Sequence, residues 1–540
     1  MTKNSRLGKE SSKFFTRDAT GLVKSIGGPS AMVGNLFVTG IAYGLVFAFF
    51  TSSLYLGANL PLTVLFTLAP VMIWSLVYYM LTVAMPRTGG DYVWVSRAIH
   101  PLLGFVGNYF YTIGLITTNA VVAAWIVVYG LQPMIAGLGI VYSSQGLISA
   151  ASEIAALPTS FLISIVILSV FMILLFFSTR SIFRAMWVIY AIIMVSVVAM
   201  IASFFLAPPS VFSANFDRLS GMNYSDVIST AGLPTGFTLG ATLTGSIFTV
   251  TNLAGFNASA YFASEVRQAK VSQFIAIIGS ALFSSLILGL IYASAYYSMG
   301  SSFLSSVSFL AASGNSKYVL PAAPVLNFLA VFANPNPIVI VLSSLALIAT
   351  SVGSLIAFTF TATRSVFAWS FDRLLPSWLA NVDQKRGSPY AAVILLWILS
   401  TIFTVVYYYT PFFTYYIYSS VLLITTFGIA SLGAALFPFS RRTKSAFDTA
   451  PAFVRKKLGS VPLVSIIGVI GFLFAAYLDY GSFLPSVTPP PSGSPLVQFT
   501  AYVIVPLIAI SAIIIYFVSY YYRRSKGIDL RLGFEEIPPE

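Results

Sequence analysis

Long apolar stretches recur along the whole chain, and they constrain its fold more than any other feature. Each has about 20 mostly apolar residues, the length that a helix needs to cross about 30 Å of hydrocarbon. Charged residues make up only 8% of the sequence, whereas soluble domains have about 25%. We therefore predict an all-α polytopic membrane protein with twelve transmembrane helices. The predicted spans are residues 29–51, 60–83, 101–129, 159–177, 186–207, 237–263, 274–299, 337–365, 390–408, 414–437, 461–477 and 500–520.

Basic residues alternate between the loops in a way that fits twelve spans. If the N-terminus is cytoplasmic, all but Arg218 and Lys317 of the 28 lysines and arginines lie in the tails, in the loops on that side or, for Arg364, at the end of a span next to such a loop. Cytoplasmic loops of membrane proteins carry such an excess. We predict a protein of the cell membrane with both termini in the cytoplasm. The formal charge of +13 then reflects orientation and contact with membrane lipid, and no nucleic-acid partner is expected.

Small and polar residues interrupt two of the predicted spans. The stretch FTVTNLAGFNASAYFASE at 248–265 places Thr, Asn and Gly where a bilayer helix normally has Leu or Val. Gly255 costs about 1 kcal/mol relative to Ala inside a helix, so we expect a break near 252–255. Span one carries GNLFVTGIAYG at 34–44. Taken alone, this second stretch indicates close helix packing as readily as a binding site.

The two interrupted spans occupy corresponding positions in two five-helix halves. Five helices separate the start of span one from the start of span six, so the halves have opposite orientations. Such a pair is typical of an inverted-repeat (5+5) transporter with its site near the bilayer midplane. The predicted organisation is a tail at 1–28, a first half at 29–207, a second half at 237–437, two further helices at 461–520 and a tail at 521–540.

The residue types that most enzyme chemistry needs are missing from the predicted spans. The chain has no Cys and a single histidine, His100, which excludes thiolate metal sites, Cys nucleophiles and clusters of His ligands. No paired carboxylates lie within the spans, so we predict no enzyme activity, no cofactor and no metal. His100 precedes Pro101 at a junction between loop and helix, where a capping or surface role is expected.

The loop at 84–101 has a distinctive sequence. Two glycines permit a tight turn, and Asp91 is expected to cap the helix that follows. The pattern PRTGGDY at 86–92, followed by VSRA at 95–98, resembles the first cytoplasmic loop of transporters of the amino acid–polyamine–organocation (APC) superfamily. Three further stretches are similar to that family's span six, to its loop after span eight and to the C-terminus of many members. They are 254–266, 364–376 with 387–389, and 527–540.

This resemblance covers nearly the whole chain and implies a leucine-transporter-like fold in which helices one and six are discontinuous. It also implies a secondary active transporter that moves amino acids or related small amines by alternating access. By position, the resemblance places the substrate-binding residues at the two breaks: Val38, Thr39, Gly40, Ile41, Ala42, Thr251, Asn252, Leu253, Ala254 and Gly255.

Helix ends can hold an amino acid without charged side chains. The N-terminus of a half-helix carries partial positive charge and a C-terminus partial negative charge, so the first can hold a carboxylate and the second an ammonium group. We assign 39–42 to the carboxylate and the carbonyls of 251–253 to the ammonium. Relatives often have a large aromatic gate where this chain has Thr251, and many have an acid where it has Asn257. The absence of a negative side chain argues against a cationic substrate.

Three further residues are candidates for gating. Glu265 stands where an apolar run ends. It is either a charged helix terminus or one half of an inner-gate ion pair with a base from the N-terminal tail or a neighbouring loop. Tyr415 and Tyr416 at the start of span ten are candidate gate residues, although tyrosines there also anchor helices at the membrane interface.

Hydroxyl groups in span eight are candidates for an ion site. Thr350, Ser351 and Ser354 lie where the family's sodium-coupled members place two ion ligands, and hydroxyl oxygens suit a hard cation. Such hydroxyls also commonly bond to their own helix backbone. Span five lacks the Lys that some proton-coupled relatives use, which argues against proton coupling through that route. Na⁺ and H⁺ are the candidate coupling ions. The alternative function is a non-transporting amino-acid sensor on the same fold, and the oligomeric state is left open.

Overall fold

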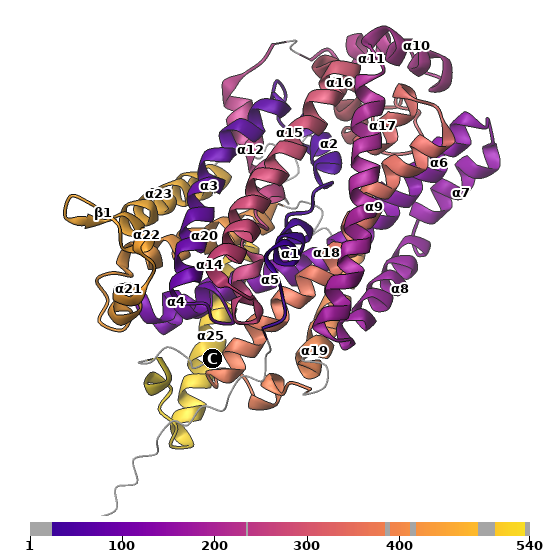
Figure 1. Cartoon of the computed structure of the whole chain (residues 1–540). Helices are drawn as coiled ribbons and strands as arrows, with labels where there is room; N and C mark the ends of the chain where they lie inside the picture. The colour runs from indigo at the N-terminus through magenta and orange to yellow at the C-terminus, as the bar shows by residue number, and fades with distance from the viewer. Residues whose placement is uncertain (1–23, 234–235, 384–388, 411–416, 484–502, 535–540) are drawn as a thin grey trace, which may run out of the picture.

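The computed structural model describes residues 24–233, 236–383, 389–410, 417–483 and 503–534, which form a bundle of helices (Figure 1). Eleven helices in these residues are long and apolar enough to cross a membrane. This confirms the predicted all-α polytopic membrane fold. In chain order the elements are α1 (Gly28–Thr39) with α2 (Gly44–Leu54), α3 (Leu60–Ala84), α5 (Pro101–Trp125) with η1 (Ile126–Leu131) and α6 (Gln132–Val141), α8 (Thr159–Ile173) with η2 (Leu174–Phe176), α9 (Thr179–Phe205), α14 (Ala269–Gln273) with η4 (Phe274–Gly279) and α15 (Ser280–Met299), α18 (Pro337–Phe371), α19 (Tyr390–Tyr409), α20 (Ile417–Leu436), α23 (Leu463–Phe483) and α25 (Val505–Ser525).

The predicted span at 237–263 is not among these eleven helices, because its longest helical piece has only 15 residues. α12 (Leu239–Leu253) covers its first part, and the chain then turns before the short α13 (Ala258–Tyr261) and η3 (Ala263–Glu265). The turn after Leu253 includes the predicted break. The count of twelve spans therefore stays a prediction.

The first predicted span is broken as well. α1 ends at Thr39, and the backbone of Gly40 has a φ of +70° before α2 begins at Gly44. Glycine adopts this left-handed conformation without the steric cost that a Cβ imposes. The break falls within the GNLFVTGIAYG stretch, as predicted.

Several short helices gather at one end of the bundle, called the loop side here. They are α7 (Gln145–Ala155), α10 (Pro209–Leu219), α11 (Tyr224–Ala231), α16 (Ser301–Ala312) and α17 (Leu326–Ala333). Figure 1 shows α10, α11 and α16 at this end, far from the end of α25. The sequence predicts long outer loops at 131–158, 208–236 and 300–336, with one amphipathic piece at 319–333 that is either an outer lid or an interface helix. α17 lies within that piece, whereas α7, α10, α11 and α16 were not predicted. The side chains of Ser144 and Asn223 cap two of these helices by accepting backbone N–H bonds, a local stabilisation that composition alone does not reveal.

The opposite end, from which α1 begins and at which α25 ends, is called the tail side. Its described short elements are α4 (Asp91–Ala98), η5 (Ser377–Ala380), α21 (Lys444–Thr449), α22 (Ala452–Arg455), the antiparallel pair β1 (Lys457–Leu458) and β2 (Val461–Pro462), and η8 (Leu530–Phe534). His100 caps α5 here, since its Nδ1 accepts the N–H of Leu102 at 3.2 Å. The predicted capping role of His100 is confirmed.

Candidate functional site

The two helix breaks touch each other and are joined by Asn252. Its side-chain Nδ2 donates hydrogen bonds to the carbonyl oxygens of Thr39, at 3.0 Å, and Gly40, at 2.9 Å. Its Oδ1 is buried and has no hydrogen-bond partner among the described residues. Gly255 lies against the same turn, because a Cβ at this position would lie 1.9 Å from the nitrogen of Thr39. The structure thus brings together the two segments that the sequence predicted to form one site.

Backbone groups of opposite polarity are left free at these breaks. Within the described residues, the N–H groups of Ile41 and Ala42, just before α2, donate no hydrogen bond, and the carbonyls of Asn252 and Leu253, at the end of α12, accept none. The N–H groups in the first turn of a helix have no intrahelical partners, and neither do the carbonyl groups in the last turn. The breaks therefore offer donors for an anion and acceptors for a cation without a charged side chain.

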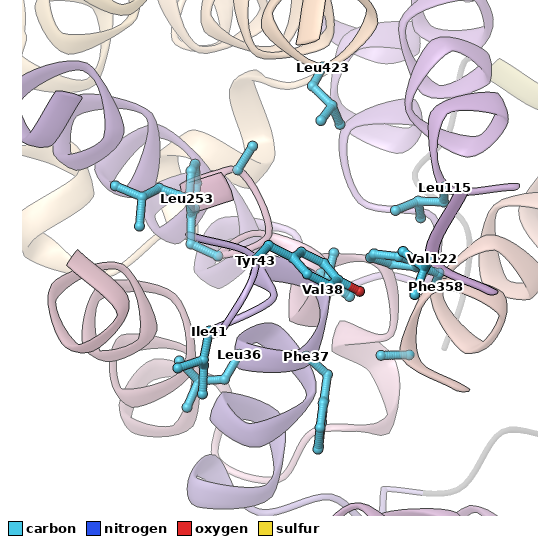
Figure 2. Packing of buried hydrophobic residues seen from close by; sticks show 14 of the residues in the cluster. Leu36, Phe37, Val38, Ile41, Tyr43, Leu115, Val122, Leu253, Phe358 and Leu423 are labelled. Carbon is cyan, nitrogen blue, oxygen red and sulfur yellow. The ribbon is translucent and has the colours of Figure 1, made fainter. Parts of the chain in front are cut away.

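A small cavity lies beside the breaks. Figure 2 shows Val38 and Tyr43 at the first break, with Leu115, Phe358 and Leu423 contributed by other helices. No charged residue is among the described lining residues. The lining consists of Val38, Thr39, Tyr43, Phe47, Tyr111, Gly114, Leu115, Thr118, Thr251, Ala254, Phe358 and Leu423.

The predicted substrate-binding residues divide into two groups. Four of them line the cavity: Val38, Thr39, Thr251 and Ala254. The others lie beside it, either in the two turns or, for Asn252 and Leu253, at the end of α12: Gly40, Ile41, Ala42, Asn252, Leu253 and Gly255. Sequence reasoning missed the lining from α5, α18 and α20, because the contact between these helices and the breaks is long-range.

Aromatic rings cover the cavity toward the loop side. The rings of Phe47 and Phe248 stack with centroids 5.6 Å apart, and Trp125 meets Tyr43 and Phe47 edge-on, also at 5.6 Å. Sequence reasoning missed this cluster. The available signal was that Phe248 precedes Thr251 by about one helical turn, on the same face of α12. The predicted gate residues Tyr415 and Tyr416 lie outside the described residues.

A buried ion pair closes the structure toward the tail side. Both carboxylate oxygens of Glu265 accept hydrogen bonds from Arg364 of α18, at 2.9 and 3.0 Å, and both side chains are at most 3% exposed. The backbone N–H groups of Ser25 and Ile26, before α1, donate to the carbonyl of Glu265. Glu265 is therefore not a solvated helix terminus. Its basic partner comes from a transmembrane helix rather than from the tail or a loop, which corrects that part of the prediction.

The span-eight hydroxyls lie where α18 contacts α1. The Ser354 hydroxyl donates to the carbonyl of Phe37 at 2.6 Å. The hydroxyl oxygens of Thr350 and Ser351, within one helical turn of Ser354, are buried and have no hydrogen-bond partner among the described residues. The Ser354 hydroxyl thus contacts α1 near the first break, and the three hydroxyl oxygens have the donor chemistry that suits a hard cation.

A family model described as "Amino acid permease" matches residues 30–522. This chain belongs to the amino acid permease family. No match was found among curated proteins. Membership makes the chain a multi-pass membrane protein of amino acid transport and confirms the family resemblance; the tail motif at 527–540 lies beyond the matched residues. It also implies a small-molecule substrate such as an amino acid.

The permease holds one carboxyl group in a buried cluster beneath its site. Asp91 accepts hydrogen bonds from the hydroxyls of Tyr78 (2.8 Å) and Tyr261 (2.9 Å) and from Asn108 Nδ2 (2.5 Å). Asp91 does not cap α4, as had been predicted, since Gly90 is the N-cap residue and no side-chain cap bond forms. Burial raises the pKa of Asp91 to about 6, and the three hydrogen bonds lower it only in part. Tyr261 belongs to the broken sixth span, so the cluster ties α3, α4 and α5 to that span.

Asp91→Asn is expected to change how the permease's stability depends on pH. Between pH 4 and 6 the native Asp91 holds a proton that the unfolded chain, with a pKa of 3.8, has already lost. Wild-type stability should therefore fall as pH rises through this window, by about 3 kcal/mol from this group. Melting curves of the purified variant, measured at several pH values, should lack this part of the pH dependence of stability. The exposed control Asp226→Asn should keep it. A wild-type slope in Asp91→Asn would contradict this assignment.

Proposed function

We propose that this permease is a secondary active transporter that moves amino acids or related small amines across the cell membrane by alternating access. Its tail side would face the cytoplasm, since the basic residues concentrate there. The support for the mechanism is that the breaks in spans one and six lie together and leave free backbone groups beside one cavity. The 5+5 inverted repeat, with halves at 29–207 and 237–437, is part of the same proposal.

The free helix ends carry the argument. An amino acid has a carboxylate and an ammonium group on one carbon. The partial positive charge before α2 suits the carboxylate, through the N–H groups of Ile41 and Ala42, and the free carbonyls of Asn252 and Leu253 suit the ammonium. Backbone recognition of this kind leaves the side-chain end of the substrate to the cavity.

The aromatic cluster on the loop side of the cavity and the buried ion pair on its tail side are the proposed gates. The aromatic cluster of Phe47, Trp125 and Phe248 would open toward the loop side, and the Glu265–Arg364 pair would open toward the tail side. Only one gate would open at a time. Each gate joins segments that are far apart in the sequence, so rigid movement of one group of helices against another would break one set of contacts at once.

Ion coupling is proposed through one of two sites. Na⁺ would bind the hydroxyls of Thr350, Ser351 and Ser354 near the carbonyl of Phe37, whereas H⁺ would bind Asp91. Uptake driven by a sodium gradient and reduced in Ser351→Ala would support the first. Uptake driven by a pH gradient alone and lost in Asp91→Asn would support the second.

Uptake by purified permease in liposomes tests the proposal. We expect accumulation of at least one radiolabelled amino acid under an imposed sodium or proton gradient, together with counterflow in preloaded vesicles. Empty liposomes and vesicles without a gradient are the controls. Binding of an amino acid without uptake or counterflow would favour the sensor function, and absence of both binding and uptake would overturn the proposal.

A further inference from the structure

Gly114 faces empty space inside the protein. It lies on α5, is buried and lines the cavity, yet a Cβ added to it would meet nothing within 4 Å. Two other glycines of the same helix are packed instead. A Cβ on Gly104 would lie 2.6 Å from the backbone of Ser96, and one on Gly107 would lie 3.1 Å from Ile429. The missing side chain at Gly114 therefore enlarges the cavity and does not serve helix packing.

The cavity lining around Gly114 is largely apolar, and two of its hydroxyl groups already have partners, whereas the buried Thr39 hydroxyl has none among the described residues. Leu115, Phe358 and Leu423 contribute aliphatic and aromatic surface. The Tyr111 hydroxyl donates to Asn257 Oδ1 at 3.0 Å, and the Thr118 hydroxyl donates to the Gly114 carbonyl at 2.6 Å.

The charged groups of Glu265 and Asp91, near the broken sixth span, already have partners. Glu265 is paired with Arg364, and Asp91 accepts three hydrogen bonds. A charged substrate side chain in the cavity would lose its hydration without gaining an opposite charge, which costs several kcal/mol. An apolar side chain gains free energy there instead, because it removes apolar surface from water.

We propose that Gly114 forms the wall of a side-chain subsite that accepts the apolar side chain of a neutral amino acid and sets the largest side chain that fits. This inference rests on the proposed function, and it adds the substrate class and one residue that determines specificity. The backbone groups at the breaks hold the part common to all amino acids, whereas the Gly114 wall discriminates between their side chains.

Competition for uptake by wild-type permease tests the substrate class. Leucine and phenylalanine should compete, and lysine and glutamate should not. Strong competition by lysine or glutamate, with none by the apolar amino acids, would overturn the inference while leaving amino acid transport intact. If no amino acid competes or is taken up, the proposed function fails as well, so the two failures can be told apart.

Gly114→Ala tests the wall itself. Its methyl group projects into space that a large substrate side chain needs, so competition by leucine and phenylalanine should weaken about tenfold or more relative to alanine. The fold should be unaffected, since the methyl contacts no protein atom. Gly240→Ala is the matched control, because Gly240 is an exposed helical glycine whose Cβ would also meet nothing within 4 Å. An equal change for large and small amino acids, or no change, would overturn the role of Gly114.

Discussion

Gly255→Ala is expected to abolish uptake and to lower the melting temperature of the permease. The added Cβ would lie 1.9 Å from the nitrogen and 2.5 Å from the Cα of Thr39, and 2.1 Å from the carbonyl carbon of Val38. All three are backbone atoms, so no side-chain rotation relieves the clash. Overpacking of a core costs about 1–3 kcal/mol and sometimes more. Here the strain would also push apart the breaks that Asn252 joins.

The clash at Gly255 can be separated from the general effect of replacing a glycine. Gly289→Ala on α15 is the control, because the nearest atom to its Cβ would be 3.9 Å away, on Val64. Uptake per molecule of purified protein and thermal stability should both stay near wild type in this control. Wild-type uptake by Gly255→Ala would mean that the two breaks do not touch in the transport cycle.

Breaking the Glu265–Arg364 pair should have the second large effect. Glu265→Gln leaves a buried guanidinium without its counter-ion, and removal of one partner from a buried ion pair costs about 3–5 kcal/mol. We expect a lower melting temperature and a shift toward a structure that is open on the tail side. Added cysteines that line the cavity should then react faster with thiol reagents supplied from that side.

Two further variants separate a gate from a merely structural pair. Glu265→Gln combined with Arg364→Gln removes both charges, so it should recover part of the stability that Glu265→Gln loses. Glu153→Gln on α7 is the control, since Glu153 is exposed and should change neither stability nor labelling. Unchanged uptake and labelling in Glu265→Gln would contradict the gate.

The parts of the fold predicted correctly are those that short stretches of sequence encode. Apolar runs predicted the long helices, and the small and polar residues around Gly40 and Gly255 predicted both breaks. Four helices on the loop side, α7, α10, α11 and α16, were missed, because their sequences, rich in serine and other small or polar residues, resemble loops in composition. The continuation of the third membrane-crossing helix past Leu131, into α6, was missed as well.

The candidate site was predicted where it depends on one segment and missed where it depends on several. Asn252 was placed at the break, but its bonds to Thr39 and Gly40 span more than 200 positions. Arg364 was seen as part of a motif and not as the partner of Glu265. The role of Gly114 depends on what surrounds it in space, which a single sequence does not encode locally.

Protection of a single cysteine tests the central claim most directly, and the chain favours this experiment because it has no Cys of its own. Thr118→Cys places a thiol of similar size in the cavity lining, and Ser152→Cys on the exposed part of α7 is the control. We expect a transported neutral amino acid to slow labelling of Thr118→Cys, with the same half-saturating concentration as uptake, and to leave Ser152→Cys unaffected. Continued uptake with no protection of Thr118→Cys would contradict a substrate site at the two helix breaks.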